Sequence, residues 1–307
     1  MNEKGWRFTG NERKYIDIVM KSGFGASESG SMNEQLEKKF AELHNKKFAI
    51  SANSGTSTLH MALEAFGVGA GDEVIIPALT VAMPGFAVWQ CGATPVFADV
   101  LKDTFLIDPS DVKQKITSKT KAIMPVHMYG NMCDMDSIMK IAKLNQLFVL
   151  EDCAESLYAS NDRGEKAGTI GDVGSWSFEN SKHLSTGDGG IVATDNEKLA
   201  TTMRQFGGVG FKNITAKTGK VRISRDEFQD PKYERHNILA YNYRLPELCA
   251  AVGLAQCERV EFFVKLRETI GNQYLEVMTD SNLFIPQKTQ DGFRNTYWTF
   301  PTRFLGN

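Results

Sequence analysis

The chain has 307 residues, of which 42% are hydrophobic and 23% are charged. This length allows one large domain, or a large domain with a smaller one, and the composition is ordinary for a globular protein in water. Lysine and arginine number 35 against 37 aspartates and glutamates, so the formal net charge is −2. Such a balance argues against nucleic acid or an anionic membrane as a partner.

The five cysteines are scattered along the chain, and none belongs to a CxxC pair. Neither a disulfide framework nor a zinc site is therefore expected, and we predict no metal ligands. Residues 1–13 are polar and lack an apolar signal core, and no apolar run approaches the roughly 20 residues of a membrane span. We expect a cytoplasmic protein.

Short apolar runs alternate with amphipathic stretches from about residue 47. The runs predicted as strands are 48–51, 73–77, 95–99, 122–126, 148–151, 175–178 and 190–194. Most are unbroken rather than alternating, which is typical of strands buried on both faces. Apolar residues recur at helical spacing over 31–47, 55–66 and 133–145. This order predicts an α/β fold with a mainly parallel, doubly wound sheet.

Three later segments fall outside that alternation. Residues 208–236 are rich in Gly, Lys, Arg and Asp, with little periodicity, and are predicted to form a long functional loop. A long helical region follows Pro246, and residues 296–302 are predicted to form a further strand.

The segment Ser54-Gly55-Thr56-Ser57 lies between a predicted strand and a predicted helix. A helix N-terminus offers unpaired N–H groups and the positive end of the helix dipole, which suits a phosphate. Glycine allows close approach of the ligand, and the hydroxyl groups add donors. Serine and threonine are also the commonest N-caps, so the segment taken alone favours capping over a phosphate site.

Three carboxylates, Glu151, Asp152 and Glu155, stand at the carboxyl end of the predicted strand 148–151. Ligands of doubly wound sheets bind at that edge. A carboxylate there can pair with a protonated heterocycle nitrogen. Taken alone, the segment is also compatible with an acidic helix cap.

Lys182 follows the aromatic-rich strand 175–178 and precedes the glycine-rich residues 187–190. Most lysines are solvated surface residues. Here the small residues leave room for a ring and a second substrate, and a lysine in such a place can serve as a Schiff-base amine and proton shuttle. In this order the three segments supply what pyridoxal phosphate (PLP) requires: a phosphate cradle, an acid for the pyridine nitrogen and an amine.

From about residue 30 the chain resembles the sugar aminotransferases of the DegT/DnrJ/EryC1/StrS family, which have the type I fold of PLP enzymes. The motifs that carry the resemblance are Ser54-Gly55-Thr56 with Leu59-His60, 71–77 (GDEVIIP), 92–100 (GATPVFADV), 125–130 (PVHMYG), Glu151-Asp152, Gly171-Asp172, Ser177-Phe178, 187–190 (GDGG) and 241–245 (YNYRL).

The resemblance implies two domains. A PLP-binding large domain covers residues 31–245, and a small α+β domain covers 246–307 together with the N-terminal segment 1–30. Chains of the family continue well past residue 302, so we expect the small domain to be incomplete here.

Site residues are carried over position by position. Lys182 resembles the Schiff-base lysine, Asp152 the partner of the pyridine nitrogen, and Glu155 the residue beside the ring hydroxyl. The residues expected around the phosphate are Gly55, Thr56, Ser57, Ser177 and Asn242.

Four positions bear on the surroundings of the ring and on the substrate. Asn242 matches a phosphate ligand that the family supplies from the neighbouring subunit, which implies a homodimer with shared active sites. Val81 stands where the family usually has an aromatic residue stacked on the ring, so an aliphatic side chain is expected to cover it. His183 and Tyr241 are candidates for substrate contact, and His183 is equally compatible with an ordinary loop residue.

The resemblance implies that an amino group moves from glutamate to a keto sugar, expected to be nucleotide-linked, in amino-sugar and polysaccharide biosynthesis. A dehydratase branch of the family replaces the lysine by histidine. Counting from Ser177-Phe178, that position is Lys182, which favours transamination. The alternatives are a PLP-dependent sugar dehydratase, a cyclitol aminotransferase and a catalytically impaired PLP-binding homologue.

Overall fold

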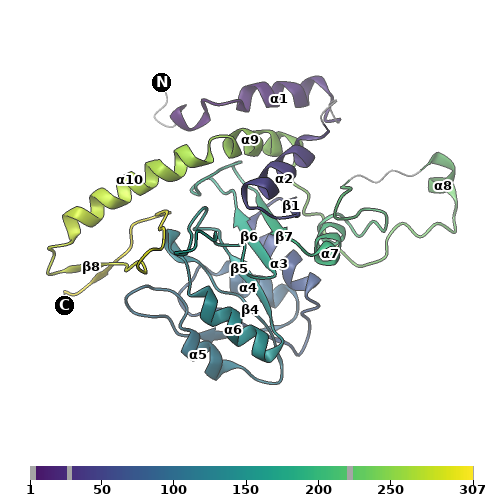
Figure 1. Cartoon of the computed structure of the whole chain (residues 1–307). Helices are drawn as coiled ribbons and strands as arrows, with labels where there is room; N and C mark the ends of the chain where they lie inside the picture. Colours follow the sequence, from purple (N-terminus) through teal and green to yellow (C-terminus); the bar gives the residue numbers. More distant parts are fainter. Residues whose placement is uncertain (1–4, 26–29, 220–223, 307) are drawn as a thin grey trace.

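The computed structural model describes residues 5–25, 30–219 and 224–306. Within them a seven-stranded sheet has the order β1-β7-β6-β5-β4-β2-β3 (Figure 1). Its strands are β1 (Phe48–Ala52), β2 (Glu73–Pro77), β3 (Thr94–Ala98), β4 (Thr120–Ile123), β5 (Phe148–Asp152), β6 (Val173–Ser177) and β7 (Gly190–Thr194). Only β7 runs antiparallel to its neighbours in this sheet. The prediction of a mainly parallel sheet is confirmed.

The strands form where the sequence has unbroken apolar runs, because both faces of the sheet are covered. In β2, Val74, Ile75 and Ile76 are all buried. β3 lies at the edge and is more exposed, and its Pro95 is tolerated there because an edge strand needs fewer ladder donors.

The described residues form helices that cover both faces of the sheet and others that lie beyond it (Figure 1). They are α1 (Glu12–Lys21), α2 (Met32–Leu43), α3 (Gly55–Ala65), α4 (Met83–Gln90), α5 (Pro109–Lys115), α6 (Met135–Asn145), α7 (Glu197–Gly207), α8 (Arg225–Gln229), α9 (Glu247–Cys257) and α10 (Val260–Met278). One apolar core joins α3, α4 and α7 to the sheet, and the other joins α2, α5, α6 and α9 to its opposite face. The sheet therefore has the two covered faces of a doubly wound fold.

The N-terminal helix α1 lies along α9, and α10 continues beyond the end of α9 (Figure 1). Gln256 of α9 donates hydrogen bonds to the Arg7 carbonyl and to Glu12, and Tyr15 donates to Glu258 at 2.5 Å. Past α10, β8 (Phe284–Pro286) pairs antiparallel with β9 (Thr302–Phe304). These contacts support grouping the N-terminal segment with residues after 246. The division at 30 and 245 stays a prediction, and residues 1–4 and 26–29 lie outside the described ones.

Two predictions of local structure need correction. The strand predicted over 296–302 is wrong, because Thr296 donates its N–H to the Gly130 carbonyl and Tyr297 has a φ of 46°, so the backbone leaves the extended conformation. The described part of 208–236 includes the short helix α8, which lies away from the sheet (Figure 1). Residues 220–223 of this segment lie outside the described ones, and its functional role stays a prediction.

Candidate active site

Lys182 lies in the loop that follows β6, at the carboxyl edge of the sheet. Its Nζ is 3.6 Å from Oε1 of Glu155 and 4.1 Å from the centroid of the Trp298 ring. The side chain is 13% exposed. The amine is therefore held between an acid and an aromatic face but stays accessible to a ligand.

Groups distant in the sequence hold the backbone of this loop. Arg7 donates to the Lys182 carbonyl, and Arg267 of α10 donates to the Ser181 carbonyl at 2.8 Å. The Trp298 indole N–H donates to the same Ser181 oxygen at 3.1 Å. Neither arginine is predictable from the sequence, because a side chain that binds another segment's backbone leaves no local motif.

Two buried carboxylates, those of Asp152 and Glu155, lie on the side of the site that holds the Lys182 amine. Asp152 ends β5, and its Oδ1 accepts from the Ala154 N–H at 3.0 Å. Burial raises the pKa of Asp152, and the Ala154 hydrogen bond and the charge of Lys182 oppose that shift. Burial also raises the pKa of Glu155, whose Oε2 accepts from the Tyr129 N–H. Among the described residues, Glu155 Oε1 has no hydrogen-bond partner, so an acceptor is available beside Lys182.

The N-terminus of α3 is capped by a side chain of the adjoining residues. Ser54 is the N-cap, and its Oγ accepts from the Ser57 N–H at 3.0 Å. The Ser57 hydroxyl donates to Oδ1 of Asn53 at 2.7 Å. The capping interpretation therefore holds for Ser54, and the hydroxyl of Ser57 is already engaged.

The same helix end leaves donors for a phosphate. The N–H groups of Gly55 and Thr56 fall in the first turn, where no intrahelical acceptor exists. Ser177 ends β6 directly opposite, because a Cβ built on Gly55 would lie only 2.8 Å from the Ser177 Cβ. Gly55, Thr56 and Ser177 therefore form a cradle of donors, whose role as a phosphate site stays a prediction.

Val81 lies between β2 and α4. Because β2 runs parallel to β4, and β4 to β5, this loop shares a sheet edge with Asp152. Val81 is exposed, with 41% of its surface open. Its position suits an aliphatic cover over a ring, and this role stays a prediction.

His183 is buried beside the lysine. Its Nε2 donates to the Thr296 carbonyl at 2.9 Å. Burial, with the positive charge of Arg267, lowers its pKa to about 3, so the ring is neutral at physiological pH. This placement favours an ordinary buried loop residue over a substrate contact.

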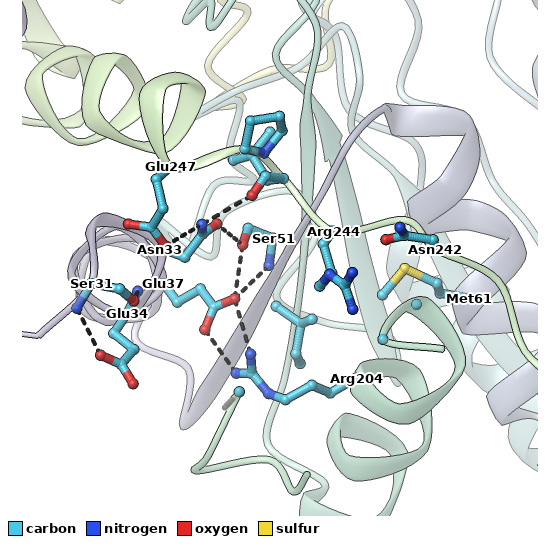
Figure 2. Close-up of a pocket in the computed structure, with 16 residues that line it drawn as sticks. Ser31, Asn33, Glu34, Glu37, Ser51, Met61, Arg204, Asn242, Arg244 and Glu247 are labelled. Atoms are coloured by element: carbon cyan, nitrogen blue, oxygen red, sulfur yellow. Dashed lines mark hydrogen bonds and ion pairs between the residues drawn. The ribbon is translucent and has the colours of Figure 1, made fainter. Parts of the chain in front are cut away.

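Asn242 and Tyr241 lie elsewhere. Both are exposed, and the Tyr241 ring stacks on Tyr243 with 5.2 Å between centroids. Among the described residues no reported contact joins either of them to Lys182. Asn242 instead lines a cavity of about 420 Å³, in which Glu37 pairs with Arg204 (Figure 2).

The sheet edge thus assembles an accessible amine, two buried carboxylates and a phosphate cradle. A family model described as the DegT/DnrJ/EryC1/StrS aminotransferase family matches residues 7–305. The chain belongs to this family. It is a sugar aminotransferase of amino-sugar biosynthesis with pyridoxal phosphate as its cofactor, as the sequence predicted.

Known proteins similar to this aminotransferase include enzymes of two reaction types. The GDP-perosamine synthase of Escherichia coli O157:H7 is 38% identical over 290 residues, which cover 94% of this chain and 74% of that protein. The solved aminotransferase from Psychrobacter cryohalolentis is 31% identical with a TM-score of 0.85, covering 95% of this chain and 74% of that one. A GDP-4-keto-6-deoxymannose-3-dehydratase with a trapped PLP-glutamate geminal diamine is 26% identical with a TM-score of 0.85, covering 96% and 77%.

No helix in the described part of the aminotransferase could span a membrane. In residues 5–25, 30–219 and 224–306 none combines the length and apolar character needed to cross a bilayer.

Proposed function

We propose that this aminotransferase takes the amino group of glutamate and delivers it to the keto group of a GDP-linked sugar. The name of the 38% identical perosamine synthase supports the guanosine diphosphate, and the glutamate trapped in the dehydratase structure supports the donor. The observation that carries the proposal is the Lys182 amine beside Glu155, at the sheet edge where Asp152 ends β5.

In this proposal Lys182 and Asp152 perform the chemistry. When bound, pyridoxal phosphate supplies a protonated ring that withdraws electrons from the carbon losing a proton. The Lys182 amine anchors the cofactor and, once released, moves the proton to and from that carbon. Asp152 keeps the pyridine nitrogen protonated, and the cationic nitrogen gives this buried carboxylate the counter-charge that favours its ionised form.

The remaining residues orient the cofactor. Gly55, Thr56 and Ser177 hold the phosphate through backbone N–H and hydroxyl donors, at the positive end of the α3 dipole. Glu155 accepts from the ring hydroxyl through Oε1, which lies 3.6 Å from Lys182 Nζ and has no hydrogen-bond partner among the described residues. Val81 covers one face of the ring.

We further propose a homodimer in which Asn242 completes the phosphate site of the partner subunit. Asn242 is exposed in its own chain. The exposed face of α4 carries Met83, Phe86 and Trp89, an apolar grouping that a second subunit would cover.

Sugar dehydration is the competing function, because a dehydratase is among the similar solved structures. Lys182 argues against it, since the dehydratase branch has histidine at that position. A lysine amine can anchor the cofactor covalently and then shuttle the proton that transamination requires.

The first test is the absorption spectrum of the purified protein with PLP, before and after glutamate. We expect a visible band of the lysine-bound cofactor, which glutamate converts to the spectrum of the aminated cofactor with release of 2-oxoglutarate. Lys182→Ala should lose the borohydride-reducible attachment and turnover. A Lys182→Ala protein that still attaches PLP covalently and turns over would exclude the assignment.

The second test identifies the acceptor reaction. The holoenzyme is incubated with glutamate and a GDP-linked 4-keto-6-deoxy sugar, and the products are analysed by mass spectrometry. Exchange of the keto oxygen for an amino group supports the proposal. Loss of a neighbouring hydroxyl instead would assign the chain to dehydration.

A further inference from the structure

Three side chains of ligand type meet outside the active site. His60 and Glu64 lie one turn apart on α3, and Cys91 follows the end of α4. Their ligand atoms all lie within 4.8 Å of one another. The i,i+4 spacing places the first two on one helix face, and only the packing of α4 on α3 adds the thiol.

The imidazole of His60 is oriented for a ligand. His60 is 1% exposed, and its Nε2 has no hydrogen-bond partner among the described residues, with Glu64 Oε1 3.4 Å away. Its Nδ1 lies 3.0 Å from the Tyr243 hydroxyl. A metal-bound histidine typically has its other ring nitrogen held in this way, which directs the free lone pair of Nε2 to the centre of the group.

A second group, His127, Glu151 and Cys153, lacks these properties. His127 Nε2 is paired with Glu151 at 3.0 Å, and its Nδ1 accepts from the Cys133 N–H at 3.0 Å. Both ring nitrogens are therefore used. All three side chains are buried, so a hydrated ion has no open side from which to enter.

We propose that His60, Glu64 and Cys91 bind one divalent transition-metal ion such as Zn²⁺. Nitrogen, carboxylate oxygen and thiolate sulfur are the donor set that Zn²⁺ prefers, whereas Mg²⁺ and Ca²⁺ require oxygen ligands. The Cys91 thiol donates to the Ala87 carbonyl at 3.3 Å, and on binding the ion it releases this proton to solvent. The side chain of Glu64 is 32% exposed, which leaves an entry route and room for water as a fourth ligand.

The site has a structural role in this proposal. The ion joins α3 to the end of α4 and, through the His60–Tyr243 contact, restrains the backbone next to Asn242. Tyr243 also accepts from the Asn53 N–H at 2.8 Å, just before the phosphate cradle. The ion would therefore stabilise the junction of these segments without contacting Lys182.

The test is titration of the PLP-loaded protein with Co²⁺, which gives a near-ultraviolet absorption band when bound to a thiolate. We expect one equivalent to bind with this band, and Zn²⁺ to displace it and raise the Tm. Cys91→Ser should lose the band, and Glu64→Gln should weaken cobalt binding about ten-fold, or ~1.4 kcal/mol. Cys249→Ser, the matched control at another partly buried thiol, should leave the titration unchanged.

Three outcomes would overturn the proposal: no band in the unmodified protein, a band that survives Cys91→Ser, or cobalt affinity unchanged in Glu64→Gln. Glu64 is partly exposed, so its variant is expected to fold, which a thermal melt without metal checks. The readout is independent of transamination, so failure of this site and failure of the proposed function are distinguishable.

Discussion

Ionisation around Lys182 is governed by burial. Burial raises the pKa of Asp152 and Glu155 and lowers that of His183 to about 3, so in each case the low dielectric favours the neutral form. A cationic partner reverses this balance for a carboxylate. We infer that binding of a protonated pyridine ring and ionisation of Asp152 are linked.

His44 gives a prediction for stability against pH. It is buried at the end of α2, stacked on Phe40 with 4.1 Å between centroids, and its Nδ1 donates to the Phe40 carbonyl. Burial lowers its pKa to about 3, opposed by the Phe40 bond and aided by the charge of Lys166. Because the unfolded pKa is about 6.5, the unfolded chain binds the extra proton between these values. The contribution of neutral His44 to the free energy of unfolding is therefore fully present above about pH 6.5 and is lost as the pH falls toward 3.

For His44→Phe, we expect the fall in the free energy of unfolding between pH 7 and pH 5 to be smaller by about 2 kcal/mol. Denaturant titrations at the two pH values measure it. His236→Gln, at an exposed position, is the control and should retain the full fall. An equal fall in His44→Phe would show that another group is responsible.

Gly55 tests the phosphate cradle. A Cβ at this position would lie 2.8 Å from the Cβ of Ser177, closer than such atoms approach, so Gly55→Ala must push the cradle open. We expect PLP to bind at least about ten-fold more weakly, equivalent to ~1.4 kcal/mol, measured by titration of the visible band. Gly69→Ala, whose Cβ would meet open space, is the control. Unchanged affinity in Gly55→Ala would place the phosphate elsewhere.

At the scale of elements, the Lys182 loop depends on structure far from it in sequence. It has no helix or strand of its own, and its carbonyl groups accept from Arg7 before α1 and from Arg267 in α10. The guanidinium of Arg267 also donates to the Trp298 carbonyl at 2.6 Å. Helix α10 thereby positions both the lysine and the aromatic face over its amine.

Arg267→Met should therefore loosen the loop without removing a group that contacts the cofactor. We expect PLP to bind about ten-fold more weakly and the glutamate half-reaction to slow, because the Ser181 carbonyl loses one of its two donors and the lysine backbone is held less firmly. Arg163→Met, which removes an exposed ion pair with Asp136, should change neither quantity. Wild-type cofactor affinity in Arg267→Met would show that Arg7 and Trp298 are sufficient to hold the Lys182 loop.

At the scale of the whole molecule, the proposed homodimer predicts that an active site needs two chains. Lys182→Ala and Asn242→Ala should each be inactive or strongly impaired as pure proteins. When the two are unfolded, mixed and refolded together, hybrid dimers contain one site with both native residues. We expect activity to return in the mixture, measured with glutamate and the keto-sugar acceptor.

The hybrid experiment distinguishes an active site shared between two chains from one formed within a single chain. If Asn242 serves the site of its own chain, a hybrid has no intact site and the mixture stays inactive. Sedimentation of each variant alone checks that both still form dimers, and a monomeric wild-type protein would contradict the proposed assembly.

Local sequence determined the architecture and the chemical groups of this protein. Unbroken apolar runs produced the strands within a few residues, because side chains buried on both faces must be apolar along their whole length. Ser54-Gly55-Thr56, Asp152 and Lys182 were recognisable because each lies at or just past the end of a strand, and parallel strands bring their carboxyl ends to one edge.

Only the tertiary structure decided which distant groups complete these sites. Arg7 and Arg267 bind the Lys182 loop across the fold, His183 turned inward to the Thr296 carbonyl, and Cys91 came to lie beside His60. The strand predicted at 296–302 failed for the same reason, since a hydrogen bond to Gly130 redirects that backbone. Hydrophobic periodicity reports how each segment is buried, whereas a polar contact between segments depends on packing that no single stretch of sequence encodes.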